Sequence, residues 1–87
     1  MLQWTQDDAI AFECACEVIT DMMAIQSCQI AEEAKKTAPD ADREASLRAE
    51  RSRLYKERLA LHVDDHGEVA RIRTEYGAII RAMRERK

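Results

Sequence analysis

Glycine, proline and aromatic residues are scarce in this sequence: its 87 residues include two glycines, one proline and four aromatic side chains. All-β folds need many turn residues, so this scarcity disfavours them. With glycines only at positions 67 and 77, the chain cannot form a phosphate-binding loop, a dinucleotide fingerprint or the nucleophile elbow of a hydrolase. A chain of this size also struggles to enclose a dry pocket. We therefore expect a protein that is not an enzyme and that uses no cofactor.

Long apolar runs are also missing. No stretch approaches the ~18 apolar residues that a membrane span requires, and the neutral to acidic N-terminus lacks the basic segment of a signal peptide. The three cysteines are an odd number, which fits a reducing compartment better than a disulfide scaffold. Arginines outnumber lysines ten to four, a bias associated with GC-rich bacterial genomes. These features predict a soluble bacterial protein of the cytoplasm.

The abundant residues favour helices. The chain is 46% hydrophobic and 36% charged, and its alanine, glutamate and arginine content is typical of one small helical domain. Its net charge of −3 is unevenly divided, because residues 1–40 carry eight acidic and two basic groups whereas residues 41–87 carry nine and twelve. The two halves therefore attract each other in an antiparallel arrangement, within one chain or between two. Because a chain this short buries only about 60% of its unfolded surface, we expect self-association.

Residues 5–36 are predicted to form one long helix. Thr5 can cap its start, with Asp8 in the positive first turn, and no glycine or proline follows before Pro39. At 1.5 Å per residue this helix is ~45 Å long, so the molecule must be elongated unless the helix breaks. Its apolar side chains cover well over half of its circumference, whereas one partner helix covers a stripe of about 100°. The helix therefore needs cover on two sides, from two other helices or from a second subunit.

A second helix is predicted over residues 39–61. Pro39 suits the first turn of a helix, and Asp40 favours its positive end. Leucines at positions 47, 54 and 61 form a narrow seam at heptad spacing, flanked by Tyr55 and Leu59. We expect this seam to pack as in a coiled coil.

A third helix is predicted over residues 65–86. Asp65 and Glu68 have the spacing of a capping box. The apolar side chains then repeat at intervals of three and four: Val69, Ile72, Tyr76, Ile79 and Met83. Alternatively, the second and third segments form one helix that bends at residues 64–67. The predicted fold is all-α: one elongated antiparallel helical hairpin or three-helix bundle, coiled-coil-like and dimeric.

The cysteines and histidines are weak candidates for a chemical site. Cys14 and Cys16 point ~200° apart on a helix and Cys28 lies ~21 Å further along, so we expect small core residues. A helical backbone would place His62 and His66 on one face, where they could bind zinc with Asp65 as a third ligand. The simpler interpretation is that the aspartates cap a helix and the histidines are exposed at a bend. We therefore predict no metal site, and keep these three residues as an alternative.

The arginines of the C-terminal half form the second alternative, a small regulator that binds DNA or RNA. Acidic residues interrupt the arginines and no helix-turn-helix is recognisable, so a solvated face with internal ion pairs is the simpler interpretation. A dimer could still gather basic helices on one side. The candidate residues for contacts with phosphates are Arg48, Arg51, Arg53, Arg58, Arg71 and Arg73, with Arg81, Arg84 and Arg86 further along.

The main functional prediction is a non-catalytic protein–protein interaction module. The first helix carries more apolar surface than one hairpin partner covers, and we expect the surplus to form a homodimer interface or a surface for another protein. The predicted interface residues are Phe12, Ile19, Met22, Met23 and Ile30. Such a module could be an adaptor, a small chaperone-like subunit or an inhibitor that covers a partner's surface. One version is a protein of a phage or mobile element that blocks a nucleic-acid-binding machine of its host.

Overall fold

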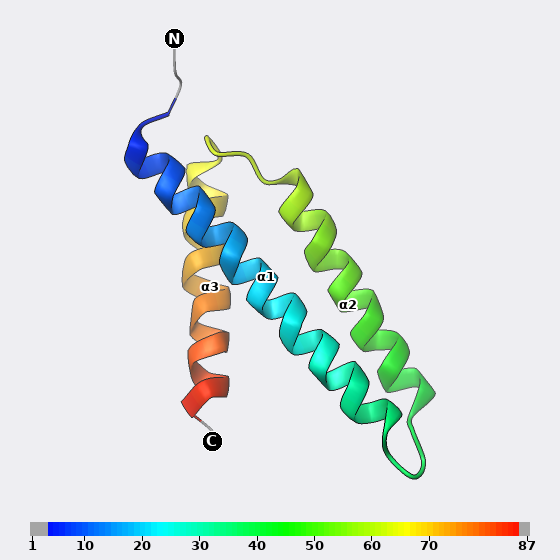
Figure 1. The fold of residues 1–87 in the computed structure, drawn as a ribbon. Helices are drawn as coiled ribbons and strands as arrows, with labels where there is room; N and C mark the ends of the chain where they lie inside the picture. The colour runs from blue at the N-terminus through cyan, green and yellow to red at the C-terminus, as the bar shows by residue number, and fades with distance from the viewer. Residues whose placement is uncertain (1–3, 86–87) are drawn as a thin grey trace.

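The computed structural model describes residues 4–85 and consists of three α-helices: α1 (Gln6–Ala34), α2 (Ala41–Ala60) and α3 (His66–Glu85) (Figure 1). No strand occurs within this part of the chain. The predicted all-α fold with three helices is confirmed, and the alternative of one bent helix after residue 39 is wrong. The helix bounds lie within two residues of those predicted, and Arg86 lies outside the described residues.

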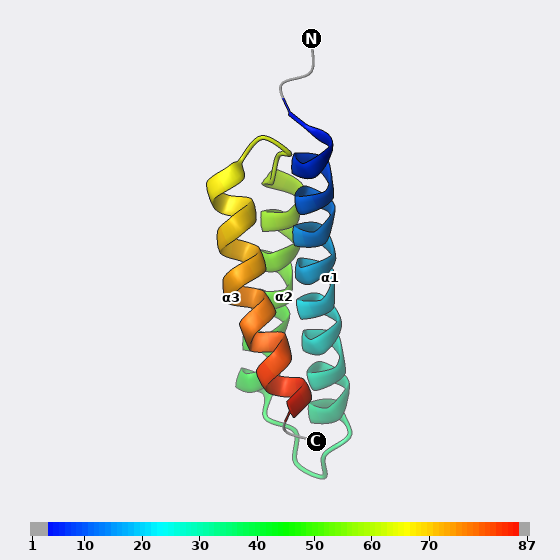
Figure 2. The same ribbon diagram turned by 90° about the vertical axis from the view of Figure 1, so that its left-hand side faces the viewer.

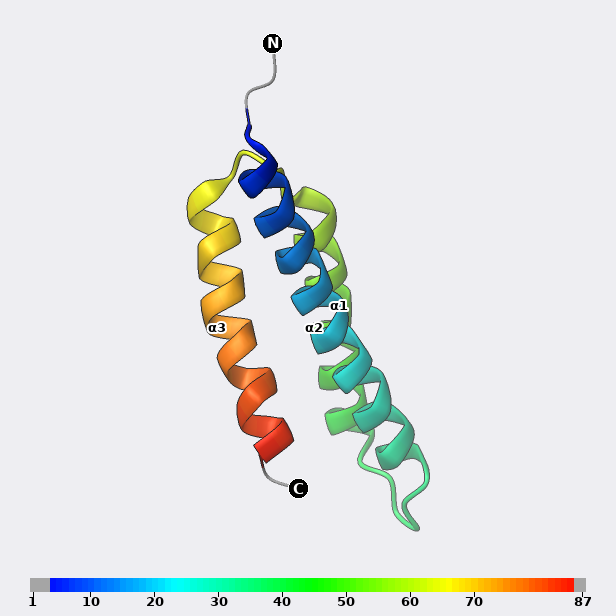
Figure 3. The ribbon, with the colours of Figure 1, turned by 60° about the vertical axis from the view of Figure 1, so that its left-hand side comes forward.

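The helices form an elongated bundle with α1 at its centre. The molecule measures 57 × 26 × 15 Å, with a radius of gyration of 15.4 Å, larger than the ~12 Å of a compact globule of this length. The backbone of α1 packs against both other helices, whereas α2 and α3 make no close backbone approach within residues 4–85. Figures 1 and 3 show that α2 runs antiparallel to α1 and that α3 then returns alongside α1, at a different place on its circumference from α2. Two helices of the same chain therefore cover a large part of α1.

The core lies where α2 and α3 meet one side of α1. Its fully buried members are Ala15 and Ile19 of α1, Leu54 of α2 and Ile72 of α3. Around them lie Met22, Leu61, Val69, Tyr76 and Ile80. The predicted leucine seam therefore faces α1, although Leu47 is only half-buried.

One part of the predicted third-helix pattern is wrong. Ile79 is 44% exposed, and its neighbour Ile80 is buried in its place. A straight helix has 3.6 residues per turn, so three turns from Val69 lead to position 80 rather than 79. The three-and-four alternation drifts off the core face unless helices supercoil.

The helix caps account for the starts of α1 and α2. The Thr5 N–H donates to Asp8 Oδ2 at 2.9 Å and the Asp8 N–H donates to Thr5 Oγ1 at 3.1 Å, so the predicted capping box is confirmed. Asp40 is the N-cap of α2, because its carboxylate accepts from the N–H groups of residues 42 and 43. At α3 the expected capping box is not formed. The Asp65 carboxylate accepts instead from the His62 N–H, and Glu68 pairs with Arg71.

The connection between α1 and α2 is fastened by a buried carboxylate. Glu33 is 2% exposed and accepts hydrogen bonds from the Asp40 N–H at 2.9 Å and from Lys36 Nζ at 3.0 Å. Arg43 Nε lies 3.1 Å from the same carboxylate. The Asp40 N–H, then Lys36 and Arg43, hold the pKa of Glu33 below its ordinary value of 4.5. The ionised form of Glu33 is therefore the one that this turn stabilises.

We expect the Glu33 contacts to make stability depend on pH. Because the folded-state pKa is lowered, the stabilisation is present at pH values above 4.5 and is lost as the pH falls through the folded-state value. Glu33→Gln should lower the melting temperature at pH 7 and flatten its dependence on pH between 6 and 3, measured by circular dichroism. Glu32→Gln, at the exposed neighbouring position, is the control. Parallel pH profiles for the Glu33 variant and the wild type would contradict this prediction.

A polar side chain lies unpaired in the core row of α1. The Oε1 atom of Gln26 is buried, and no hydrogen-bond donor of residues 4–85 reaches it. Gln26 lies four residues from both Met22 and Ile30, which are buried on the same side of the helix. A buried acceptor without a donor lowers stability.

Replacement of Gln26 by methionine should stabilise the protein, since it keeps the side-chain length and removes the unpaired acceptor. We expect the free energy of unfolding to rise by about 1 kcal/mol in urea denaturation. Gln29→Met, one turn further on α1, is the comparison. A Gln26→Met variant that is less stable than the wild type would show that the carbonyl is satisfied.

Candidate interaction surface

The predicted interface side chains of α1 are divided between the core and the surface. Ile19, Met22 and Ile30 are buried within the single chain, so the expectation that they form an exposed interface is wrong in this structure. The reason is that α2 and α3 cover the side of α1 on which they lie. Phe12 and Met23 are half-buried at the edge of the core and keep part of their surface exposed.

Part of the remaining apolar surface lies on one face of the α1–α2 hairpin; Trp4, Ile10 and Ile79 are also exposed. Figure 2 shows that α2 and α3 leave one side of α1 uncovered. On α2, Tyr55 is 50% and Leu59 is 62% exposed. These side chains are four residues apart and therefore neighbours on the helix surface. We call the combined surface the α1–α2 face; it comprises Phe12, Glu13, Cys16, Glu17, Thr20, Asp21 and Met23 of α1 with Arg51, Tyr55, Arg58 and Leu59 of α2.

Two shallow grooves run along this face. Phe12, Glu17 and Thr20 line the first together with Arg58 from α2. Met23 lines the second together with Arg51 and Tyr55. Both grooves are open to solvent. They bring side chains of α1 and α2 together at two levels of the hairpin.

The contacts within the hairpin set which residues share a level. The Arg51 guanidinium donates to Ser27 Oγ at 3.0 Å. Since α1 and α2 are antiparallel, Tyr55 then lies beside Met23, and Arg58 beside Thr20 and Glu17. The pairing of the two helices therefore fixes the pattern of the face.

The charges on the α1–α2 face are arranged in rows. Glu13, Glu17 and Asp21 follow each other at intervals of four on α1, so their carboxylates lie along one line of the helix. Within residues 4–85, none of these three carboxylates forms an ion pair. Arg58 forms none there either, and Arg51 contacts only a neutral hydroxyl. An acidic row therefore lies beside a row of two arginines, and both have unused charge.

A third groove lies outside the α1–α2 face, between α1 and α3. Ile25 and Cys28 of α1 face Ile80 and Met83 of α3, and the acidic groups of Asp21 and Glu32 lie on its rim with Arg84. The apolar part of this groove comes from the edge of the core. It differs from the α1–α2 face in that none of its large apolar side chains is exposed: Ile80 is buried, and Ile25 and Met83 are half-buried.

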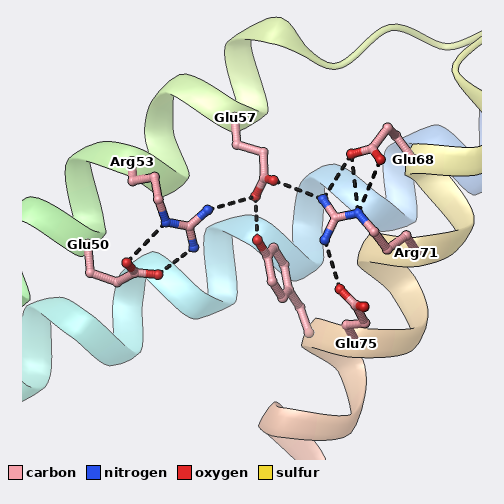
Figure 4. Close-up of polar contacts among 7 residues, drawn as sticks. Glu50, Arg53, Glu57, Glu68, Arg71 and Glu75 are labelled. Atoms are coloured by element: carbon pink, nitrogen blue, oxygen red, sulfur yellow. Dashed lines mark hydrogen bonds and ion pairs between the residues drawn. The ribbon is translucent and has the colours of Figure 1, made fainter.

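Apart from these grooves, a polar network of side chains connects α2 and α3 (Figure 4). Glu57 is its centre: it accepts from the Tyr76 hydroxyl at 2.5 Å and from Arg71 Nη2 at 3.0 Å. Arg53 Nη1 lies 3.8 Å from the same carboxylate. Arg71 also lies over the Tyr76 ring, 5.8 Å from its centroid. Side chains thus join two helices whose backbones do not meet.

Further glutamates complete the network at its two ends. Arg53 pairs with Glu50, and Arg71 pairs with Glu68 and Glu75. Arg53 lowers the pKa of Glu50, and Arg71 lowers the pKa of Glu68. The same pairs raise the pKa values of both arginines further above their ordinary range. These guanidiniums are therefore occupied within the chain.

The arginines proposed for nucleic-acid contacts do not form one surface. Arg53 and Arg71 belong to the network between α2 and α3, and Arg48 pairs with Glu44 at 3.0 Å. Arg51 and Arg58 lie on the α1–α2 face, whereas Arg73 is exposed on α3. The simpler interpretation of the sequence, internal ion pairs, therefore holds for Arg48, Arg53 and Arg71.

The backbone geometry required for the alternative metal site is absent. Residues 61–65 form a non-helical connection and α3 begins at His66, so His62 and His66 do not share one helix face. His66 Nε2 lies 3.4 Å from Asp8 Oδ2 instead. The part of the chain that the structure describes contains no group of three or more His, Cys, Asp or Glu side chains placed to hold a metal ion.

The expectation that all three cysteines are core residues is wrong. Cys14 and Cys16 are half-buried, and Cys28 is exposed. All three are free thiols. Cys28 lies on the side of α1 that no other helix covers fully, where it lines the groove beside α3.

The predicted interface residues did not include Tyr55 and Leu59, the two exposed large apolar side chains of α2. Tyr55 and Leu59 flank the leucine seam in sequence, but their exposure depends on which side of α2 turns toward α1. No sequence signal pointed to Glu57 as the centre of a network, because its partners Arg71 and Tyr76 are 14 and 19 residues away.

Comparisons with known proteins do not place this chain in a family: no protein-family model matches it, and no curated protein or solved structure was found to be similar. Among residues 4–85, no helix combines the length and the apolar character needed to cross a membrane.

The Tyr76 hydroxyl should contribute measurably to stability. Tyr76→Phe removes the donor to Glu57 while the ring stays buried, so we expect the free energy of unfolding to fall by about 1–2 kcal/mol. Tyr55→Phe, the same change at an exposed position, should have almost no effect. Urea denaturation of both variants measures the difference, and equal effects would contradict a special role of the Tyr76–Glu57 hydrogen bond.

Proposed function

We propose that this protein is a non-catalytic protein-binding module that uses its α1–α2 face. The carrying observation is the exposure of Tyr55 and Leu59, next to the partly exposed Phe12 and Met23. Four large apolar side chains on one face form a larger patch than scattered single residues do, and such patches mark interaction sites.

The physical basis of binding is the burial of this patch. Removing a large apolar side chain from water contributes about 1.5–3 kcal/mol when burial is complete, and less when it is partial as here. Aromatic side chains such as Tyr55 are enriched among the residues that dominate binding energies. The acidic row of α1 and Arg58 would add selectivity, since charges at an interface favour a complementary partner and disfavour others.

The same mechanism serves an adaptor, a small chaperone-like subunit and an inhibitor that covers a partner's surface. Each of them needs a rigid face rather than a catalytic pocket. The structure supports rigidity, because Glu33 fastens the α1–α2 turn and the Glu57 network ties α2 to α3. We rank the nucleic-acid-binding alternative lower, because three of its six arginines pair with glutamates of the same chain.

A photocrosslinking residue at position 59 tests the proposal in living cells. We expect light to join the protein covalently to another polypeptide through this position. The matched control is the same residue at position 78, which is exposed on α3 away from the face. Equal products at both positions, or no product at position 59, would contradict binding through the α1–α2 face.

A further inference from the structure

We infer that the α1–α2 face binds a second copy of this chain, with α1 of each copy packed antiparallel against α2 of the other. This inference rests on the proposed function, in that it assigns an occupant to the same face. Three features of the face support it: complementary charge rows, matched levels along the hairpin, and apolar side chains that are exposed on α2 and partly exposed on α1.

The two halves of the face are complementary to each other. The α1 half carries the carboxylates Glu13, Glu17 and Asp21, which form no ion pair within residues 4–85. The α2 half carries Arg51 and Arg58 next to the exposed Tyr55 and Leu59. A partner that suits the α1 half must present cations and apolar groups, which the α2 half does. The chain therefore contains the chemistry that its own face requires.

A two-fold axis parallel to the helices brings these halves together. Such an axis, running just outside the face and midway between α1 and α2, puts α1 of one copy opposite α2 of the other. Both contacts then form at once, as in the self-complementary interface of a symmetric dimer. Because rotation about this axis leaves every residue at its own height, residues at one level within a hairpin also meet across the interface.

The levels of the charged residues match under this rotation. Glu17 and Arg58 line the same groove within one chain, so Glu17 of each copy faces Arg58 of the other. By the same reasoning, Met23 of each copy meets the level of Tyr55 in the other, since these two also share a groove. Each of these contacts occurs twice in the dimer.

The resulting core is an antiparallel four-helix bundle. The helices α1 and α2 are antiparallel within each chain, and the rotation also makes α1 antiparallel to the α2 opposite it. Every adjacent pair is then antiparallel, as in up-down-up-down bundles. With 20 residues in α2, the face is ~30 Å long and roughly 20 Å wide, or about 600 Å² per copy. This is somewhat below the ~800 Å² per partner of a standard interface and falls in the size range of weak, reversible complexes.

Charge reversals at one contact test this arrangement. Glu17→Arg places two cations opposite each other in a homodimer, and Arg58→Glu places two anions there. We expect sedimentation equilibrium to show dimers of the wild type, about twice its 10.0 kDa, and an at least tenfold weaker self-association of either variant. Asp64→Arg and Arg73→Glu make the same changes of net charge away from the face and should leave the dimer intact.

Mixing the two variants is the decisive step. In a mixed dimer, the arginine introduced at position 17 of one copy meets the glutamate introduced at position 58 of the other. The second contact keeps the original pair, Arg58 with Glu17, so dimers should form again at the wild-type concentration. No effect of a substitution within its own chain can be reversed by adding the other variant.

Leu59→Lys changes an exposed side chain and should weaken the dimer without affecting the helical circular-dichroism signal.

Several outcomes would overturn this inference. A wild type that stays monomeric up to ~1 mM, single variants that dimerise as the wild type does, or a mixture that remains monomeric would each do so. The photocrosslink at position 59 keeps the two proposals apart. A product joined to a different protein, with a monomeric wild type, would leave the proposed function standing and reject the second copy as the occupant.

Discussion

The apolar surface of α1 is wider than one helix can cover, and the rest of the structure depends on this constraint. A helix of 29 residues with apolar side chains around more than half of its circumference must be covered on two sides. The chain meets part of this need by folding α2 and α3 back along α1 (Figure 1). Since both helices approach α1 from one side, the other side keeps the acidic row and the edge residues Phe12 and Met23 at the surface.

Polar interactions of two glutamates hold α2 and α3 in place. Glu33 fastens the start of α2 to the end of α1, and Glu57 links α2 to α3 where their backbones do not meet. Glu33 is buried and Glu57 is half-buried, which costs desolvation energy, but each accepts two or more hydrogen bonds. They stabilise the arrangement in which Leu54 and Leu61 of α2 turn toward the core. That orientation leaves Tyr55 and Leu59 exposed.

The helices were predictable because their signals are local. The Thr5–Asp8 capping box and the break near Pro39 lie within a few residues, and both were confirmed. The interface residues were not, because helical periodicity shows that Ile19, Met22 and Ile30 share an apolar side but not whether the same chain covers it. The metal alternative failed for a related reason, since it required a helical backbone at His62 that only the structure could test.

The α1–α2 face illustrates how a small chain divides its surface between folding and binding. Within residues 4–85, α2 and α3 leave one side of α1 without a covering helix. Phe12 and Met23 pack against the core with only part of their surface, and the rest of it stays exposed on this side. Packing against a copy of the same hairpin, as we propose, would cover this side of α1 with another helix and would pair the carboxylates that form no ion pair within residues 4–85.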